Sequence, residues 1–159
     1  MNNIHVDCVL DAKANLGEGP IWSIKDQNLY WVDINNCQLC KFNPVNGENI
    51  TINVGKPIGC FAIKKNLNII LALTNGFFEL NQSDKSMNFI NNPETNILDN
   101  RFNDGTVDLK GRFYAGTMAI SGSNINSKPK GSLYCLDRSG KVKKTMEGFY
   151  TINGLAFSP

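Results

Sequence analysis

The feature that most constrains this chain is a repeated pattern of short apolar runs joined by polar turns. Three segments share it: IWSIKDQNLYWVD (21–33), FAIKKNLNIILAL (61–73) and TVDLKGRFYAGT (106–117). Each begins as an apolar strand, turns on a stretch that contains lysine, and returns as a second, more hydrophobic strand. No segment of 11 or more residues has the apolar spacing of an amphipathic helix. The pattern therefore predicts an all-β protein built from hairpins.

Two further strands follow each hairpin. They are QLCKFNP and ENITINV in the first unit, FFELNQ and SMNFIN in the second, and GSLYCLD and KVKKTME in the third. The connecting turns PVNG, QSDK and RSGK are rich in residues that favour chain reversal. Each unit is thus predicted to hold four antiparallel strands.

The units recur at a regular spacing. Taking Trp22, Ala62, Val107 and Phe157 as equivalent positions of the first strand gives steps of 40, 45 and 50 residues, and the polar insertion 121–131 lengthens the last step. Four-stranded units at this spacing are typical of β-propeller blades. We therefore expect three blades and the first strand of a fourth. Their predicted limits are 16–55, 56–92, 101–147 and 152–159.

The N-terminal run alternates between apolar and polar side chains. Ile4, Val6, Cys8 and Leu10 occupy every second position, which predicts a half-buried strand of the kind that completes the last blade of a closed propeller. Three blades and one strand leave two sheet faces and their edges unpaired. We therefore expect the N-terminal half of a larger propeller, or one half of a two-chain ring.

Composition excludes several classes of protein. Hydrophobic residues make up 42% and charged residues 19% of the 159 residues, as in a soluble globular domain. The net charge of +2 comes from scattered residues without a basic stripe, so we expect no nucleic-acid partner. No apolar run approaches the 18 residues of a membrane span, and the first 20 residues lack the pattern of a signal peptide.

The cysteines predict a reducing compartment. The chain has five cysteines at irregular spacing, which predicts free thiols in a cytoplasmic protein. Cys37 and Cys40 form a Cys-x-x-Cys pair, but no second pair or histidine follows at the spacing of zinc ligands. A chance pair within a hairpin is favoured over a redox or metal site.

Polar side chains recur at one slot of the repeat. Four positions before each equivalent residue stand Glu18, Ile58, Asn103 and Asn153. If the first strand of each blade lines the central channel, the loop that enters it opens at one end of that channel. The four side chains should then converge, three of them through oxygen atoms, with Ile58 as an apolar wall.

Their chemistry suits a hard cation and a polar substrate. Glu18 offers a carboxylate and Asn153 an amide oxygen, the ligand types of Ca²⁺, Mg²⁺ and Mn²⁺. A single carboxylate holds a divalent ion weakly, so we expect a further acidic ligand from another blade. Arg101 carries a planar fork of donors for a carboxylate, a hydroxyl or a developing oxyanion.

Each of these residues also has a purely structural interpretation, because asparagine and aspartate beside glycine often form turns. Asp104, next to Gly105, is predicted either to form a turn or to support a ligand from behind. Asp33 and Asp108 are expected to end strands and to bind turn amides. His5, the only histidine, lies on the predicted leading strand away from the channel, which argues against catalysis by histidine.

At these residues the chain resembles a known family. The motifs LGEGPIW (16–22), YWVDI (30–34), RFNDGTVDLKGRFYAGTM (101–118), GSLYCLD (131–137) and INGLAFSP (152–159) are similar to those of the SMP-30/gluconolactonase/luciferin-regenerating enzyme family. The resemblance implies a six-bladed β-propeller with one divalent metal ion in its channel. It also implies hydrolysis of sugar lactones, with the metal polarising the carbonyl and activating water.

The resemblance assigns roles to individual residues. It implies that Glu18 and Asn153 bind the metal and that Arg101 and Asn103 contact the substrate, with the remaining ligand and general base an Asp beyond Pro159. Ca²⁺ is the expected ion, with Zn²⁺, Mg²⁺ or Mn²⁺ as alternatives. Regucalcin-type members carry an acidic residue soon after the Gly-Thr-Met sequence, where this chain has AISGS and no carboxylate.

Three hypotheses follow for the function. The first is a lactonase of which this chain is an inactive N-terminal part, with a sugar lactone as its small-molecule partner. The second is a non-catalytic calcium-binding or regulatory propeller, and the third is a truncated remnant. For the chain alone we expect poor solubility, or self-association through the open edges into a dimer that mimics six blades.

Overall fold

Twelve strands account for about half of the residues that the computed structural model describes, which are 4–121 and 128–158. In chain order they are β1 (Gly17–Ser23), β2 (Asn28–Asp33), β3 (Gln38–Phe42), β4 (Asn49–Asn53), β5 (Ile58–Ile63), β6 (Ile69–Leu73), β7 (Gly76–Leu80), β8 (Met87–Asn91), β9 (Asn100–Val107), β10 (Phe113–Ala119), β11 (Gly131–Leu136) and β12 (Val142–Phe149). These ranges contain no helix, and hence no helix that could cross a membrane.

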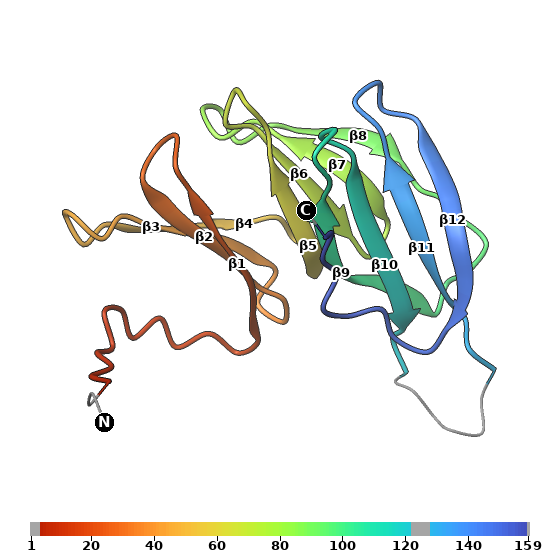
Figure 1. Cartoon of the computed structure of the whole chain (residues 1–159), viewed down its shortest axis with the longest axis horizontal. Helices are drawn as coiled ribbons and strands as arrows, with labels where there is room; N and C mark the ends of the chain where they lie inside the picture. Colours follow the sequence, from red (N-terminus) through yellow and green to blue (C-terminus); the bar gives the residue numbers. More distant parts are fainter. Residues whose placement is uncertain (1–3, 122–127, 159) are drawn as a thin grey trace.

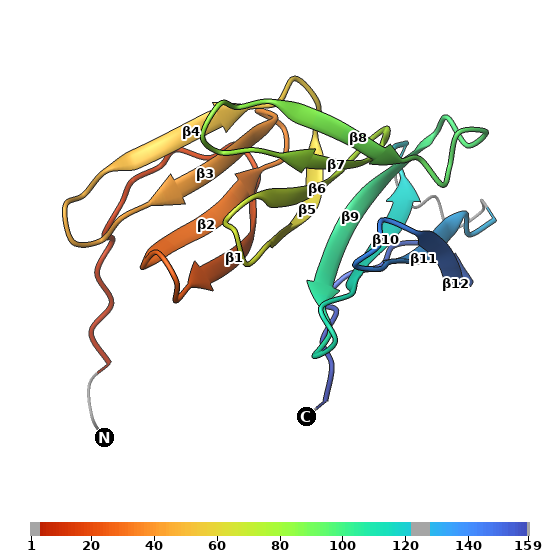
Figure 2. The same cartoon turned by 90° about the horizontal axis from the view of Figure 1, so that it is seen from above.

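The strands form three four-stranded antiparallel sheets in which neighbours in sequence are neighbours in space. Sheet 1 holds β1–β4, sheet 2 holds β5–β8 and sheet 3 holds β9–β12 (Figure 1). Seen from above, the sheets follow one another in an arc, with the first strands β1, β5 and β9 on its inner side (Figure 2). The prediction of an all-β chain with three four-stranded units is confirmed.

The hairpin turns confirm a second prediction. Asp33 is the last residue of β2, and its carboxylate accepts the amide of Asn36 in the following turn at 3.4 Å, as well as those of Asn15 and Leu16, which precede β1, at 2.9 and 3.1 Å. Asp108 directly follows β9 and accepts the amides of Lys110 and Arg112, both at 2.9 Å. Both carboxylates therefore satisfy backbone donors where the strands end.

Two hydrophobic clusters hold the sheets together. The first lies between sheets 1 and 2 and includes Tyr30, Val32, Phe61 and Leu71. The second lies between sheets 2 and 3 and is rich in aromatic rings, among them Phe77, Phe102, Phe113 and Tyr134. Sheet 2 is therefore buried on both faces, whereas sheets 1 and 3 each bury one face against it.

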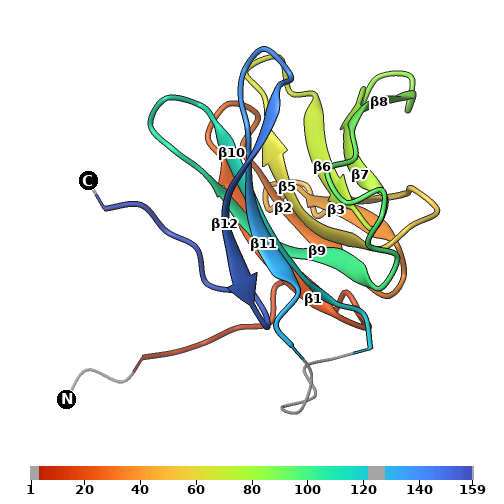
Figure 3. The same cartoon turned by 90° about the vertical axis from the view of Figure 1, so that its right-hand side faces the viewer.

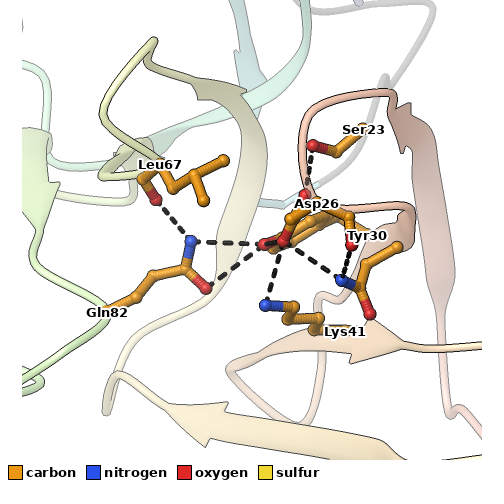
Figure 4. Close-up of polar contacts among 7 residues, drawn as sticks. Ser23, Asp26, Tyr30, Lys41, Leu67 and Gln82 are labelled. Atoms are coloured by element: carbon orange, nitrogen blue, oxygen red, sulfur yellow. Dashed lines mark hydrogen bonds and ion pairs between the residues drawn. The ribbon is translucent and has the colours of Figure 1, made fainter.

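A partly buried ionic cluster also joins sheet 1 to sheet 2 (Figure 4). Asp26, in the β1–β2 turn, accepts hydrogen bonds from the hydroxyls of Ser23 and Tyr30 and pairs with Lys41 at 3.0 Å. The Tyr30 hydroxyl also contacts the amide group of Gln82, in the β7–β8 turn. The cluster fixes one turn of sheet 1 against sheet 2.

The leading strand predicted for residues 4–10 is absent. These residues are in no strand, and Ile4 and Val6 are 89% and 85% exposed (Figure 3). The alternating pattern alone does not form a strand, because no other described segment pairs with it.

The strand predicted to open a fourth blade is likewise not formed. Residues 152–158 belong to no strand, and Thr151 makes a single antiparallel bridge to Met118. Residue 159 and most of the polar insertion, residues 122–127, lie outside the described residues. As at the N-terminus, the segment lacks a neighbouring strand with which it could extend a ladder.

Candidate functional site

The first strand of each sheet carries a pairing irregularity near its start. The ladder to the second strand shifts between Glu18 and Ile21 in β1 and between Ile58 and Cys60 in β5. In β9 the residue skipped by the ladder is Asn103. Bulges of this kind bend a strand and redirect its side chains. Glu18 and Asn103 therefore stand on strands at or beside bulges, and not in the loops that precede the strands, whereas Asn153 lies in a loop.

The prediction for Ile58 is wrong. Its side chain is fully buried in the cluster between sheets 1 and 2, so it is not a wall of a channel. The bulge in β5 leaves Gly59 as the residue without a ladder partner. A shift of one position moves a side chain to the other face of a strand, and the apolar pattern does not reveal such a shift.

Gly59 allows a close approach of β5 and β9. A Cβ atom at this glycine would lie 2.3 Å from the carbonyl carbon and oxygen of Phe102 and 2.8 Å from the backbone nitrogen of Asn103. Any side chain at residue 59 would therefore push the bulge of β9 away. Glycine within a strand often marks a close approach of two backbones. Gly59 is therefore the feature of the sequence that points to this contact.

Two consecutive residues of β9 hold the backbone on either side of Asn153. The side-chain amide of Asn103 donates to the carbonyl oxygen of Ile152 at 3.0 Å. The carboxylate of Asp104 accepts the backbone amides of Gly154 and Leu155 at 2.6 and 3.2 Å. The loop that carries Asn153 is thus fixed by hydrogen bonds from the β9 bulge.

A packing contact fixes the same loop. Ile152 is 6% exposed, and a Cβ atom added to Gly116 of β10 would lie 2.3 Å from its Cβ and Cγ2 atoms. The Ile152 side chain therefore occupies the space that a side chain at Gly116 would need. Gly154 has φ of +68°, a left-handed conformation that glycine adopts without strain.

Arg101 belongs to the same hydrogen-bonded unit. Its Nη1 donates to the carbonyl oxygen of Phe102 at 2.9 Å and to Oδ1 of Asn103 at 3.1 Å. Burial lowers the pKa of the Arg101 guanidinium, and the nearby carboxylate of Glu18 opposes this shift. The structure therefore brings Arg101, Asn103, Asp104 and the loop of Asn153 together, and it places Glu18 close enough to act electrostatically on Arg101.

Glu18 and Asn153 both offer exposed oxygen atoms. Within the described ranges, neither side chain forms a hydrogen bond or an ion pair, so both oxygens are available to a cation. Their donor chemistry fits a hard divalent ion. No group of three or more His, Cys, Asp or Glu side chains among the described residues could hold a metal by itself. The two side chains thus have the donor chemistry for such an ion, and a complete site would need further ligands.

A cleft of about 840 Å³ runs between the three first strands. It is lined by residues 19–25 of β1 and its turn, by residues 60–65 of β5 and its turn, and by residues 104–107 of β9. Gly19 and Asp104, which are at its border, adjoin the predicted site residues. The repeat predicted that the first strands line a common channel, and this cleft lies between those strands.

The cysteines and the histidine offer no nucleophile at this place. Burial raises the pKa of the Cys60 thiol well above its ordinary value, and the carboxylate of Asp104 adds to the effect, so the thiol is protonated. Cys37 lies in a turn, and Cys40 is buried in β3, where burial raises its pKa to about 11. The His5 side chain is 83% exposed and contacts Asp7.

Comparison with known proteins identifies the family. Residues 16–159 match the family described as SMP-30/Gluconolactonase/LRE-like region. Regucalcin from Xenopus laevis is 34% identical over 159 residues, which cover 99% of this chain and 53% of that protein. The 6-deoxy-6-sulfogluconolactonase of Pseudomonas putida is 32% identical over 157 residues, with the same two coverages.

The fold agrees with this match. A solved luciferin-regenerating enzyme superposes with a TM-score of 0.83 at 31% identity, covering 90% of this chain and 49% of that structure. The three sheets therefore have a β-propeller fold, and the chain spans about half the length of the curated relatives that it matches. This chain belongs to the SMP-30/gluconolactonase/LRE-like family.

Proposed function

We propose that the whole protein is a lactonase that hydrolyses a sugar lactone inside a six-bladed propeller, of which this chain forms three blades. The observation that carries the proposal is the hydrogen-bonded unit in which Asn103 and Asp104 fix the loop of Asn153 beside Arg101 and within electrostatic reach of Glu18. Support for the substrate class comes from the 32% identity to a sulfogluconolactonase.

The proposal includes a divalent cation, with Ca²⁺ as the first candidate. Glu18 and Asn153 would hold it, together with an acidic ligand from outside the described residues. When bound, such an ion polarises a carbonyl group and lowers the pKa of a coordinated water. The exposed oxygens of Glu18 and Asn153 are the ligand type that a hard divalent ion prefers. Because only one of the two is a carboxylate, a further acidic ligand is needed to hold the ion firmly.

Arg101 and Asn103 would orient the lactone. The Arg101 guanidinium keeps donors beyond the two contacts of its Nη1 and suits a carbonyl or hydroxyl oxygen of the substrate. The Asn103 side-chain nitrogen retains a second hydrogen for the same purpose while its first holds Ile152. Asp104 would act on catalysis only by positioning Asn153, and the general base would lie outside this chain.

A fusion tests the proposal. Joining residues 1–159 to the remaining part of Xenopus laevis regucalcin supplies the missing half from a relative of known alignment. We expect gluconolactone hydrolysis by the fusion in the presence of Ca²⁺, loss of activity with EDTA or with Glu18→Gln, and no turnover by the chain alone. A folded fusion that binds Ca²⁺ but hydrolyses no lactone under any divalent metal would instead support the non-catalytic calcium-binding function.

We also propose that the isolated chain self-associates through its uncovered sheets. Large apolar side chains are exposed on both outer sheets, among them Trp22 on sheet 1 (46%) and Met146 on sheet 3 (55%). Sedimentation should therefore show dimers or larger species. A stable, compact monomer would contradict this expectation.

A cytoplasmic location remains part of the proposal. All five cysteines are free thiols, and three of them, Cys40, Cys60 and Cys135, are buried. Free thiols persist in a reducing compartment. Localisation of a tagged protein by microscopy tests this point.

A further inference from the structure

A second cavity adjoins the cleft at the ends of β5 and β9 and shares with it the lining residues 62–65 and Val107. It has a volume of about 680 Å³ and is bordered by the β5–β6 turn (64–68), the β9–β10 turn (108–112) and the β11–β12 turn (137–141). We call it the turn groove. Arg101 stands near the start of β9, whereas the turn groove adjoins the end of that strand at Val107 (Figure 1).

The floor of the turn groove is apolar. Phe113 and Leu136, which are 3% and 4% exposed, belong to the cluster between sheets 2 and 3, and Ile70 and Ile90 pack against that cluster. A Cβ atom at Gly140 would lie 3.8 Å from Ile90, which brings the β11–β12 turn against sheet 2. The floor therefore crosses the junction between two sheets and can receive an apolar side chain.

The carboxylates that border the groove are already engaged. Glu79 accepts from Lys64 at 2.8 Å and from Asn68 at 2.7 Å. The carboxylate of Asp108 pairs with Arg112 at 2.6 Å and also binds turn amides. The third, Asp137, accepts the backbone amides of its own turn at 2.8 and 3.0 Å. Glu79 and Asp108 are thus each paired with a cation, whereas Asp137 forms no ion pair with a described residue and keeps its negative charge at the rim.

Three cations at the rim have no such partner. Lys65, Lys110 and Arg138 are exposed, and none of them forms an ion pair with a residue of the described ranges. Each of the three stands on a different turn. The Cδ atom of Arg138 lies 3.6 Å from the position that a Cβ atom at Gly111 would take, so these two turns are in van der Waals contact. Positive charges on three separate turns suit a ligand that carries several anionic groups along an extended chain.

We propose that the turn groove binds an acidic peptide segment of a partner protein. An apolar side chain of the peptide would enter the floor between Ile90 and Leu136. Aspartate or glutamate residues on either side of it would pair with Lys65, Lys110 and Arg138. The proposal rests on charge complementarity and on the apolar floor, and it is independent of the lactonase reaction.

Fluorescence anisotropy of labelled peptides with the 159-residue chain tests the proposal. The probe is fluorescein-labelled Glu-Asp-Leu-Phe-Asp-Glu. One comparison peptide has serine in place of leucine and phenylalanine, and another has lysine in place of the acidic residues. We expect saturable binding of the probe, at least about tenfold weaker binding of both comparison peptides, and a loss of affinity as salt rises.

Matched variants distinguish binding in the turn groove from attraction by the net charge of the chain. Lys110→Glu with Arg138→Glu should weaken binding of the probe at least about tenfold. Lys56→Glu with Lys143→Glu makes the same charge change at exposed residues outside the groove and should leave the affinity unchanged. Circular dichroism establishes that both variants keep the β fold.

Three results would overturn the proposal. The first is an equal loss of affinity in both double variants, which would indicate unspecific charge attraction. The second is equal binding of the serine peptide, which would leave the apolar floor without a role. The third is displacement of the probe by oligothymidylate at lower concentration than by unlabelled peptide, which would assign the rim to a nucleic acid.

Discussion

The carboxylate of Asp104 accepts a 2.6 Å hydrogen bond from the backbone amide of Gly154, which follows it by 50 residues in the chain. With the 3.0 Å bond from Asn103 to the carbonyl of Ile152, it encloses Asn153 between two anchored peptide groups. Residues 152–158 form no strand, so these contacts and the packing of Ile152 place the loop. The position of Asn153, a proposed metal ligand, thus depends on the bulge in β9.

The first prediction concerns Asp104. Its Oδ2 accepts the amides of Gly154 and Leu155, while its Oδ1 accepts the amide of Gly105. Asp104→Asn keeps only one oxygen, so one set of donors loses its acceptor, and we expect a loss of stability of about 1 kcal/mol. Hydrogen exchange should become faster at Gly154 and Leu155.

Asp84→Asn is the matched control, because the Asp84 carboxylate serves only its own exposed turn through Ser86. This variant should leave exchange at Gly154 unchanged. Equal protection of Gly154 and Leu155 in Asp104→Asn and in the unchanged chain would show that Asp104 does not hold the loop.

The second prediction concerns Gly116. Gly116→Ala would place a methyl group 2.3 Å from the Cβ of Ile152, so Ile152 must move and take the loop of Asn153 with it. We expect a destabilisation of about 1–3 kcal/mol by overpacking, measured by urea unfolding. Combined with Ile152→Gly, which removes the clashing atoms, the alanine should cost less than it does alone. Strictly additive effects of the two substitutions would contradict the contact.

The sequence allowed the hairpins to be predicted because their determinants are local. Alternating apolar residues, turns of Pro, Asn, Gly, Ser and Asp, and the contacts of Asp33 with Asn36 and of Asp108 with Lys110 all act within a few residues. The segments 4–10 and 152–158 carry the same local pattern without becoming strands. A strand needs a neighbour to satisfy its backbone groups, and the pattern of one segment says nothing about that neighbour.

The candidate site was predictable only in part. The repeat led to Glu18, Asn103 and Asn153, and the chemistry of the neighbouring side chain led to Arg101. The register failed at Ile58, because a bulge shifts the pairing by one residue without changing the apolar pattern. The contacts on either side of Asn153 join residues about 50 positions apart, and such contacts have no local sequence signal.

The third prediction concerns Arg101 in the fusion with the remaining part of regucalcin. Arg101→Lys keeps the positive charge near Glu18 but loses the planar fork and the contact of Nη1 with Asn103. If Arg101 orients the lactone, we expect KM for gluconolactone to rise about tenfold, with Ca²⁺ affinity by calorimetry nearly unchanged. A large loss of Ca²⁺ affinity with unchanged KM would place Arg101 in the metal site and not with the substrate.

The last prediction concerns acid stability and the cluster around Asp26. The Asp26 side chain is 15% exposed, and this burial alone would raise its pKa. The hydrogen bonds from Ser23, Tyr30 and Lys41, together with the charge of Lys41, outweigh the burial and lower the pKa from 3.8 to about 2. A depressed carboxyl pKa contributes stability that is fully present above the unfolded value and is lost as the carboxylate becomes protonated in the folded state.

Asp26 should therefore contribute about 2 kcal/mol at pH 7, and this contribution should disappear between about pH 4 and pH 2. Asp26→Asn should lower the free energy of unfolding at pH 7 by roughly that amount and flatten its dependence on pH in this range. Urea unfolding at pH 7, 4 and 3 measures both effects. Sheets 1 and 2 meet at this cluster. If the free energy of unfolding fell as steeply with decreasing pH in Asp26→Asn as in the unchanged chain, the ionised carboxylate would not be what joins the two sheets there.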